Sequence, residues 1–220
     1  MNQRETDLAR FNMVEQQIRT WSVLDMKVLD LLQQTPRESY VPPEYKKIAY
    51  SDVSIPLANG QKMMHPKLEA HLVQALALTS DDTVLQIGAA TGYVTALMAK
   101  LAKHVYGVEI DPELMKNAGA NLRKNNVTNV TIEEGDAISG WEEHAPYNAI
   151  AVTGSVPIIP EALKRNLAIG GRMFIVVGEM PVMEAILVTR TGDNSWTEKS
   201  LFETELPPLD NSAKPQEFVF

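Results

Sequence analysis

Apolar residues recur along this chain with two different periods, and the change between them indicates how the chain is organised. Residues 1–50 show the spacing of amphipathic helices. One apolar face of a first predicted helix carries Phe11, Val14, Ile18 and Trp21. Asp25 is placed to cap a second predicted helix, whose apolar positions are Val28, Leu29, Leu31 and Leu32. Because both apolar faces need a partner, we expect the two helices to cover a face or edge of a larger core.

Beyond residue 80, short apolar runs alternate with segments of helical spacing. The runs predict seven strands, at residues 84–87, 104–110, 130–133, 147–153, 172–177, 185–190 and 196–202. Helices are predicted at 93–102, 112–124 and 161–167, with Gly170-Gly171 ending the last, and a further helix starts at Pro66. The pattern predicts an α/β fold with a mostly parallel seven-stranded sheet, and the last two strands form an antiparallel C-terminal hairpin.

A long segment rich in polar and turn residues, at 49–66, separates these two regions. Pro36, Pro42 and Pro43 end the helical pattern before it. Long loops inside compact domains often fold over a site that a rigid scaffold carries. We therefore expect residues 1–66 to form an N-terminal helical extension and active-site loop, packed on a main domain of residues 67–220.

The predicted turn after the first strand holds the most informative residues. Gly88 and Gly92 lie between a buried strand and a helix, where glycine lets a ligand approach the backbone and the helix start offers free N–H groups. The pyrophosphate fingerprint G-x-G-x-x-G, begun at Gly88, needs glycine at 90 and glycine or alanine at 93, whereas this chain has Ala90 and Tyr93. An adenosyl ligand without phosphates takes a turn of the form acidic-x-Gly-x-Gly-x-Gly, which this chain fills with two of the three glycines and with Gln86 in the acidic position.

Two carboxylates at the ends of the next two predicted strands strengthen this interpretation. Glu109 ends the strand at 104–110, where it can accept both hydroxyls of a ribose. Asp136 follows the strand at 130–133 and can accept a hydrogen bond from an adenine amine. Each residue alone is more often a solvated side chain, yet ligands of open α/β sheets bind outside the carboxyl ends of the strands, where all three features meet. The sequence therefore predicts an adenosyl-binding site.

Composition narrows the class of protein. The 220 residues are 45% hydrophobic, enough for a substantial core, and carry a net charge of −8. The excess of acidic over basic residues argues against a nucleic-acid partner, because the phosphates of nucleic acids bind clustered Lys and Arg. No cysteine is present to form a disulfide or a thiolate site, and His65 and His71 lack metal-ligand spacing, so no metal is expected. The N-terminus lacks a signal-peptide pattern and no run is long enough to span a membrane, so we expect a cytoplasmic protein.

With these residues identified, the chain resembles the protein-L-isoaspartate O-methyltransferase family, whose members are S-adenosylmethionine-dependent enzymes with the Rossmann-like class I methyltransferase fold. The similarity runs from Phe11 to the C-terminus. It is carried by residues 13–18, 49–56, 60–61, 88–92, 135–136, 140–141, 145–153 and 170–172. The resemblance implies O-methylation of the carboxylate of L-isoaspartyl residues in damaged proteins, with a protein or peptide as partner, no nucleic acid and no membrane.

The resemblance also assigns roles to residues. S-adenosyl-L-methionine is the implied cofactor, with contacts expected from Gln86, Gly88, Ala89, Ala90, Gly92, Glu109, Ile110, Asp136, Ala137 and Thr153. Met64 occupies the position of the family's active-site serine. Because methionine donates no hydrogen bond to a carboxylate, Lys62 and His65 are the candidates to replace the serine.

Three functions remain open on the sequence. The first is the isoaspartyl methyltransferase. The second keeps the cofactor but methylates a different acceptor, in a pocket that Met63 and Met64 make more apolar. The third is a protein that binds S-adenosylmethionine or its product without turnover. A carboxylate acceptor is ionised at neutral pH and needs no general base, so loss of the serine does not by itself exclude methyl transfer.

Overall fold

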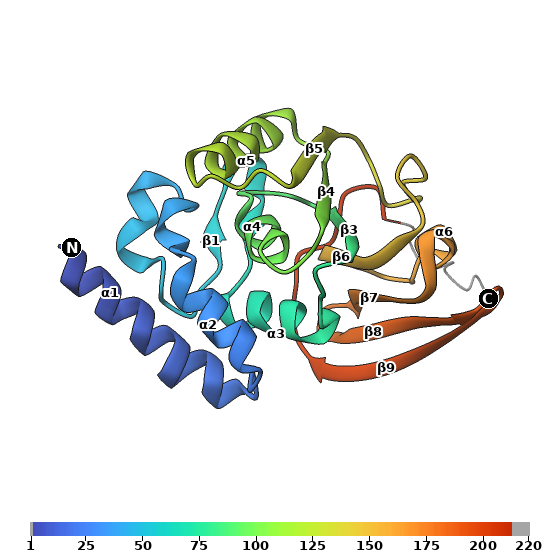
Figure 1. The fold of residues 1–220 in the computed structure, drawn as a ribbon, viewed down its shortest axis with the longest axis horizontal. Helices are drawn as coiled ribbons and strands as arrows, with labels where there is room; N and C mark the ends of the chain where they lie inside the picture. The colour runs from blue at the N-terminus through green and yellow to red at the C-terminus, as the bar shows by residue number, and fades with distance from the viewer. Residues whose placement is uncertain (1, 213–220) are drawn as a thin grey trace.

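The computed structural model describes residues 2–212 and is built on a seven-stranded sheet (Figure 1). The strands are β3 (Thr83–Ile87), β4 (His104–Glu109), β5 (Val130–Glu134), β6 (Tyr147–Val156), β7 (Leu167–Glu179), β8 (Val182–Gly192) and β9 (Ser195–Glu203). Their order across the sheet is β5-β4-β3-β6-β7-β8-β9. The first five in this order are parallel, while β8 and β9 each run antiparallel to the strand before them. The predicted sheet and its C-terminal hairpin are confirmed.

The strand order reverses at β3. The chain passes from β3 to β4 and β5 on one side, and then returns to place β6 on the other side of β3. Gln86 of β3 therefore has parallel neighbours on both edges, Gly107 of β4 and Ala151 of β6. In an open α/β sheet such a reversal opens a crevice outside the carboxyl ends of the strands that diverge there. The segments that follow β3 and β6 border this crevice.

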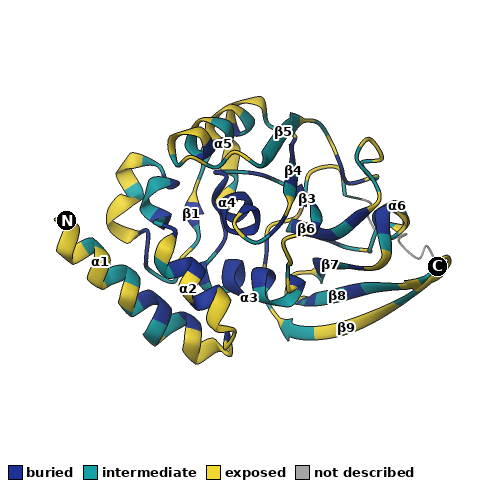
Figure 2. Cartoon of the chain, in the orientation of Figure 1, coloured by how far each residue is buried: buried dark blue, intermediate teal, exposed yellow. Residues whose placement is uncertain are grey.

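The central strands bury side chains on both faces of the sheet. Val84 and Val105 point into one core, and Leu85 and Val108 point into a second core on the opposite face. The helices of this part of the chain are α3 (Pro66–Leu76), α4 (Tyr93–Ala99), α5 (Pro112–Lys124) and α6 (Glu161–Asn166). Figure 2 shows α3 and α4 as largely buried, whereas β9 at the sheet edge is mostly exposed. Burial on two faces explains why these strands are continuous apolar runs in the sequence.

Consecutive helical segments form the N-terminal part: α1 (Gln3–Asn12), a π-helical stretch (Met13–Ile18), a 3₁₀ turn (Arg19–Trp21) and α2 (Met26–Gln34). The π-helical stretch and α2 bury side chains in the first core, whereas α1 packs against it through the partly buried Ala9. Asp25 caps α2 as predicted, because its Oδ1 accepts the N–H of Lys27 at 2.8 Å. The predicted apolar face of the first helix is wrong in part: Val14 and Ile18 are fully buried, but Phe11 and Trp21 are 52% and 56% exposed. The π-helical winding widens the turn, so residues at α-helical spacing do not stay on one face.

The segment 49–66 is not a plain loop, because it contains a small hairpin of β1 (Ile55–Pro56) and β2 (Lys62–Met63). Arg37, which is completely buried, holds both ends of the segment. Its Nη1 donates to the carbonyl of Ala49 at 2.6 Å, and its Nη2 donates to the carbonyl of Met64 at 2.7 Å. Arg37 also forms a bidentate ion pair with Glu69 of α3, at 2.8 and 3.1 Å. The hairpin is thereby fixed against α3.

Two further predictions concern the end of the helix at 161–167 and the division of the chain between residues 66 and 67. The helix predicted at 161–167 is ended by the extended backbone of Leu167, so Gly170-Gly171 lie inside β7 and not at a helix end. The proposed division between residues 66 and 67 stays a prediction, and residues 1 and 213–220 of its two parts lie outside the described residues. Within residues 2–212, none of the helices is both long and apolar enough to cross a membrane.

Candidate functional site

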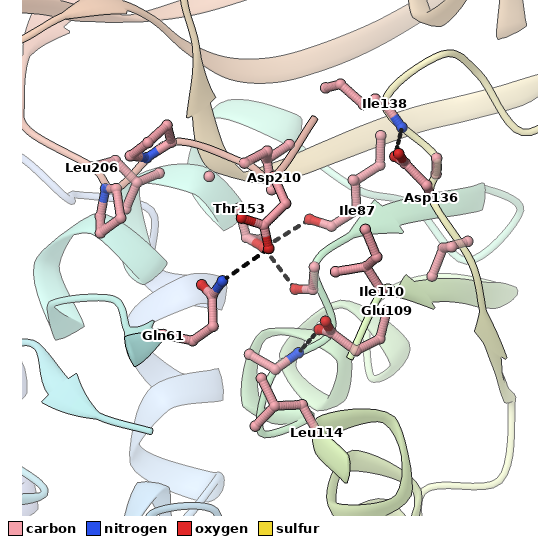
Figure 3. A pocket seen from close by; sticks show the side chains of 18 of the residues that line it. Gln61, Ile87, Glu109, Ile110, Leu114, Asp136, Ile138, Thr153, Leu206 and Asp210 are labelled. Carbon is pink, nitrogen blue, oxygen red and sulfur yellow. Dashed lines mark hydrogen bonds between the residues drawn. The ribbon is translucent and has the colours of Figure 1, made fainter. Parts of the chain in front are cut away.

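A cavity lies outside the carboxyl ends of β3, β4, β5 and β6, at the reversal of strand order. Its lining draws on five parts of the chain (Figure 3). These are the hairpin, through Gln61 and Lys62; the strand ends, through Ile87, Gly88, Ala90, Val108, Glu109, Ile110, Thr153 and Gly154; the segment after β5, through Gly135, Asp136, Ala137 and Ile138; and Leu114 with residues 206–210. The three features predicted at three strand ends thus meet in one cavity.

The turn after β3 gives the cavity a floor of backbone. Gly88 has a φ of +84°, which favours glycine, and a Cβ added there would lie 2.6 Å from Oγ1 of Thr153. The Thr153 hydroxyl lies 2.8 Å from the carbonyl oxygen of Ile87 and 2.6 Å from that of Gly88, and donates its proton between them. Thr153 therefore ties the end of β6 to the turn, and Gly88 and Thr153 both line the cavity.

Glu109 is buried at the end of β4 and is fixed by backbone donors. Its Oε2 accepts the N–H of Ala90 at 2.8 Å, and its Oε1 accepts the N–H of Asp111 at 3.1 Å. Ala90 itself has a φ of +48°, so the turn adopts a left-handed conformation at the alanine that stands for the middle glycine. Each carboxylate oxygen retains a further lone pair for a ligand, because an ionised carboxylate offers about four acceptor positions.

Gln86 and Gly92, both predicted to contact the cofactor, brace the turn. The Gln86 amide donates to the carbonyl of Gly88 at 3.1 Å and accepts the Thr95 hydroxyl at 2.6 Å, so its polar atoms are engaged within the protein. A Cβ added to Gly92 would lie 3.1 Å from atoms of Leu122 on α5, and Gly92 does not line the cavity. A cofactor contact of either residue stays a prediction, while their effect on the turn is evident from the geometry.

The segment after β5 forms the opposite wall. Asp136 is exposed, and its Oδ1 accepts the N–H of Ile138 at 3.0 Å, which turns the chain beside the cavity (Figure 3). Its Oδ2 accepts the side-chain amide of Asn211 at 2.9 Å. Ala137 is 1% exposed and lines the same wall, whereas Ile110 across the cavity is 39% exposed. Each oxygen of the Asp136 carboxylate thus already accepts one hydrogen bond, and a ligand would use the lone pairs that remain.

Residues 206–210 form a wall that the sequence interpretation missed. The segment pairs with the end of β6: the N–H of Ser155 donates to the carbonyl of Pro207, and the N–H of Leu209 donates to the carbonyl of Ser155, both at 2.9 Å. Leu209 lies over Gly154, where an added Cβ would approach its side chain to 2.6 Å. Asp210 then accepts the Gln61 amide at 3.3 Å, so the C-terminal segment and the hairpin meet across the cavity (Figure 3).

The hairpin also contacts the N-terminus of α5. The side-chain amide of Asn59 donates to Asp111, the N-cap of α5, whose other oxygen accepts the N–H of Glu113 and of Leu114. The pKa of Asp111 is held below its usual range, mainly by the hydrogen bond from the N–H of Leu114 and next by the one from Asn59. The loop predicted to fold over the site thus contacts two of its borders.

A smaller cavity adjoins the first beneath the hairpin. It is lined by Lys62, Met63, Met64, Glu69, Gln86, Gly88, Ala89, Ala90, Thr91, Tyr93, Val94 and Thr153. The two cavities are adjacent, because four residues border both: Lys62, Gly88, Ala90 and Thr153. Met64 is 5% exposed and places a thioether, without a donor, at this cavity. His65 lies elsewhere: it lines a separate groove with Trp21 and His71, and its Nδ1 is 3.5 Å from Asp52.

One cluster within residues 2–212 has the ligand types of a metal site. Glu133, Glu143 and His144 place one ligand atom each within 4.8 Å of one another. Glu133 already accepts from the Trp141 indole at 2.8 Å, and its other oxygen lies 2.9 Å from Nε2 of His144. These residues do not line either cavity, so the cluster is separate from the site.

The reversed strand order, the turn without pyrophosphate spacing and the carboxylate at the end of β4 together define a Rossmann-like methyltransferase. The model of the protein-L-isoaspartate(D-aspartate) O-methyltransferase family matches residues 9–213 of the chain. The chain belongs to this family.

Curated relatives agree over nearly the whole length. A Pelobacter propionicus protein-L-isoaspartate O-methyltransferase 2 is 35% identical over 207 residues, which cover 94% of this chain and 92% of the relative. A Rhodopseudomonas palustris protein-L-isoaspartate O-methyltransferase is 37% identical over 198 residues, which cover 90% and 91%. Sequence similarity of this extent supports the same domain from end to end.

Solved structures share the fold. A protein-L-isoaspartate O-methyltransferase superposes with a TM-score of 0.78 at 24% identity, over 92% of this chain and 66% of that chain. A Plasmodium falciparum protein described as a protein-L-isoaspartate O-methyltransferase, in complex with S-adenosyl-L-homocysteine, superposes with a TM-score of 0.79 at 20% identity, over 92% and 99%. The Rossmann-like methyltransferase architecture is therefore shown.

Proposed function

We propose that this protein transfers the methyl group of S-adenosyl-L-methionine to the free carboxylate of L-isoaspartyl residues in proteins and peptides. The observation that carries the proposal is the family membership of residues 9–213, together with a cavity at the strand reversal that Glu109 and Asp136 line. In an isoaspartyl residue the backbone runs through the side-chain carbonyl, which leaves the α-carboxylate free. Methyl transfer joins the methyl carbon to one oxygen of this carboxylate and breaks its bond to the sulfonium sulfur.

The lining of the cavity suits the cofactor, because apolar side chains and exposed backbone surround a small number of polar groups, as in other small-molecule sites. Glu109 would hold the ribose hydroxyls, because its carboxylate is fixed at the cavity wall by two backbone donors. Asp136 and the backbone beside Ala137 would border the adenine, and the bare backbone of Gly88 allows close approach of the remainder.

When bound, S-adenosyl-L-methionine supplies an electrophilic methyl group. The acceptor is an ordinary carboxylate with a reference pKa near ~4, so it is ionised at neutral pH and no residue has to remove a proton. The task of the protein is therefore to align the two reactants and to exclude water. Lys62, at the border of the two cavities, attracts the negative acceptor, and residues 206–210 shield the adenosyl side.

Labelled methyl transfer tests the proposal. The protein is incubated with methyl-labelled S-adenosyl-L-methionine and either an isoaspartyl peptide or the aspartyl peptide of the same sequence. We expect label in the isoaspartyl peptide alone, and we expect alkali to release it, because a methyl ester is base-labile. Equal labelling of both peptides, or label that resists alkali, would contradict the proposal.

A second function is favoured by one observation, the buried thioether of Met64 at the acceptor side. An apolar wall there suits an acceptor other than a carboxylate. This alternative predicts cofactor binding with no label in either peptide, and label in another component of a cell extract. Cofactor binding without any labelled acceptor would leave a protein that binds the cofactor without turnover.

A further inference from the structure

The hydroxyl of Tyr93 is buried and has no partner. Tyr93 is the first residue of α4, directly after the glycine turn, and is 1% exposed. Within residues 2–212 no hydrogen bond reaches its hydroxyl oxygen. Leaving a polar group buried and unpaired destabilises a protein, so a native structure that keeps one needs a reason. A ligand that accepts from the hydroxyl is such a reason.

The position of Tyr93 points to the methyl acceptor. Tyr93 lines the smaller cavity together with Met64 and Lys62, and this cavity shares Gly88 and Thr153 with the lining of the adenosyl cavity. The acceptor must reach the cofactor from a space that borders both the turn and the hairpin. Among these lining residues Met64 carries no hydrogen-bond donor, whereas Tyr93 carries a phenol hydroxyl.

Neighbouring side chains hold the phenol ring in place. The Tyr40 ring packs on it with a centroid distance of 5.4 Å, and Cζ of Arg37 lies 5.6 Å from its centroid. Arg37 is fixed in turn by the bidentate pair with Glu69. A donor held this way loses little conformational freedom when a ligand binds, which is the condition for effective alignment.

The charges around the cavity suit an anion. Burial raises the pKa of the Tyr93 phenol well above its ordinary value, with Glu69 adding to the shift, so the group stays a protonated donor. Burial also raises the pKa of Glu69, and Arg37 opposes that shift. The bidentate pair cancels the charge of Glu69, and the remaining charged side chain of the lining is Lys62.

We propose that Tyr93 donates a hydrogen bond to the acceptor carboxylate and thereby supplies the donor that Met64 lacks. This inference rests on the proposed function. It makes Tyr93 an acceptor-binding residue, in addition to Lys62 and in place of His65, whose side chain lines a different groove.

The test is Tyr93→Phe, which removes only the hydroxyl. We expect kcat/KM for an isoaspartyl peptide to fall about 10- to 100-fold, the loss of a hydrogen bond to a charged group. Cofactor affinity, measured by calorimetry, should stay unchanged, and Tm should stay unchanged or rise because an unpaired buried hydroxyl is gone. The matched control is Tyr147→Phe, since the Tyr147 hydroxyl donates to the carbonyl of Trp141 at 2.8 Å away from both cavities. Tyr147→Phe should lower Tm and keep the kinetics.

A double variant separates donation from structure. In the Tyr93→Phe background, Met64→Ser restores a hydroxyl at the cavity, so we expect it to regain a larger factor in kcat/KM than Met64→Ser gains in the wild type. A purely structural role of Tyr93 predicts no such difference and would overturn the inference. Equal kinetics of Tyr93→Phe and wild type would also overturn it, as would a loss of cofactor affinity that matches the loss of rate, because the hydroxyl would then serve the cofactor.

A measurement on the wild-type protein covers the case that Tyr93→Phe does not fold. With tyrosine labelled by ¹³C at Cζ and S-adenosyl-L-homocysteine bound, the Tyr93 resonance should shift on addition of the isoaspartyl peptide and not of the aspartyl peptide. No shift would overturn the inference. A wild-type protein that labels no isoaspartyl peptide would refute the proposed function and this inference together, whereas an active wild type with an unaffected Tyr93 would refute the inference alone.

Discussion

Removal of the Glu109 carboxylate should weaken cofactor binding by a predictable amount. The side chain is 5% exposed, lines the adenosyl cavity, and is oriented by the N–H groups of Ala90 and Asp111 at 2.8 and 3.1 Å. Two charge-assisted hydrogen bonds to the ribose together contribute about 2–3 kcal/mol. At 1.36 kcal/mol per factor of ten, Glu109→Ala should therefore raise the Kd roughly 30- to 160-fold.

The same substitution has a structural cost that the assay must separate. Without the carboxylate, the N–H groups of Ala90 and Asp111 lose their acceptor, which should lower the free energy of unfolding by about 1–3 kcal/mol. Calorimetric titration with S-adenosyl-L-homocysteine is therefore done well below the Tm of the variant. Glu134→Ala, an exposed carboxylate at the end of the neighbouring β5 that does not line the cavity, is the matched control and should bind normally. A folded Glu109→Ala protein with wild-type affinity would refute the assignment of Glu109 to the ribose.

Further substitutions, at the glycine turn, at Arg37 and at Met64, test separate parts of the structure. Gly88→Val should weaken cofactor binding more than it lowers stability, because its side chain would enter the space beside Thr153. Gly92→Val should chiefly lower Tm, because its side chain would meet Ala118 and Leu122 of α5. The reverse order in calorimetry and thermal melts would exchange these roles. Arg37→Met should lower the free energy of unfolding by about 3–5 kcal/mol in a denaturant titration, because it leaves Glu69 buried without its partner. The double variant Arg37→Met with Glu69→Leu should recover most of this loss. An Arg37→Met protein as stable as wild type would contradict this prediction. Met64→Ser should raise the initial rate on an isoaspartyl peptide at saturating cofactor by less than about tenfold, because one donor is already present, and leave cofactor affinity unchanged; no gain in a folded variant would favour a different acceptor.

The fold and the meeting of the strand-end residues were predictable because they depend on backbone topology. Parallel strands place their carboxyl ends at one edge, so Glu109 and Asp136 had to converge with Gly88 once the order of strands was known. The apolar runs, buried on two faces, specify those strands without reference to side-chain direction.

Side-chain direction was not predictable in the same way. Gln86 and Gly92 sit in the motif, yet the first turns its amide toward Thr95 and the second faces α5. Lys62 and His65 are three positions apart and line different cavities, because the chain leaves β2 between them and enters α3. Such choices depend on contacts between segments far apart in the sequence, among them the buried Arg37 that positions the hairpin.

The wall at 206–210 escaped prediction for a related reason. Pro207 and Pro208 carry no periodic pattern, and a proline has no N–H to continue a sheet. Two backbone hydrogen bonds with Ser155 position the segment, and no local sequence pattern predicts them. The π-helical stretch at Met13–Ile18 likewise shifted the buried face of the first helix away from Phe11 and Trp21.

Mass spectrometry of one peptide tests the central claim most directly. The peptide carries an isoaspartyl, an aspartyl and a glutamyl residue, so the three carboxylates compete for the same enzyme and cofactor in one reaction. Isoaspartyl methylation predicts a single added methyl group, which fragmentation places on the isoaspartyl residue, with no methyl on the other two. Methyl groups on the aspartyl or glutamyl residue at a comparable rate, or an unmodified peptide in the presence of bound cofactor, would contradict the account.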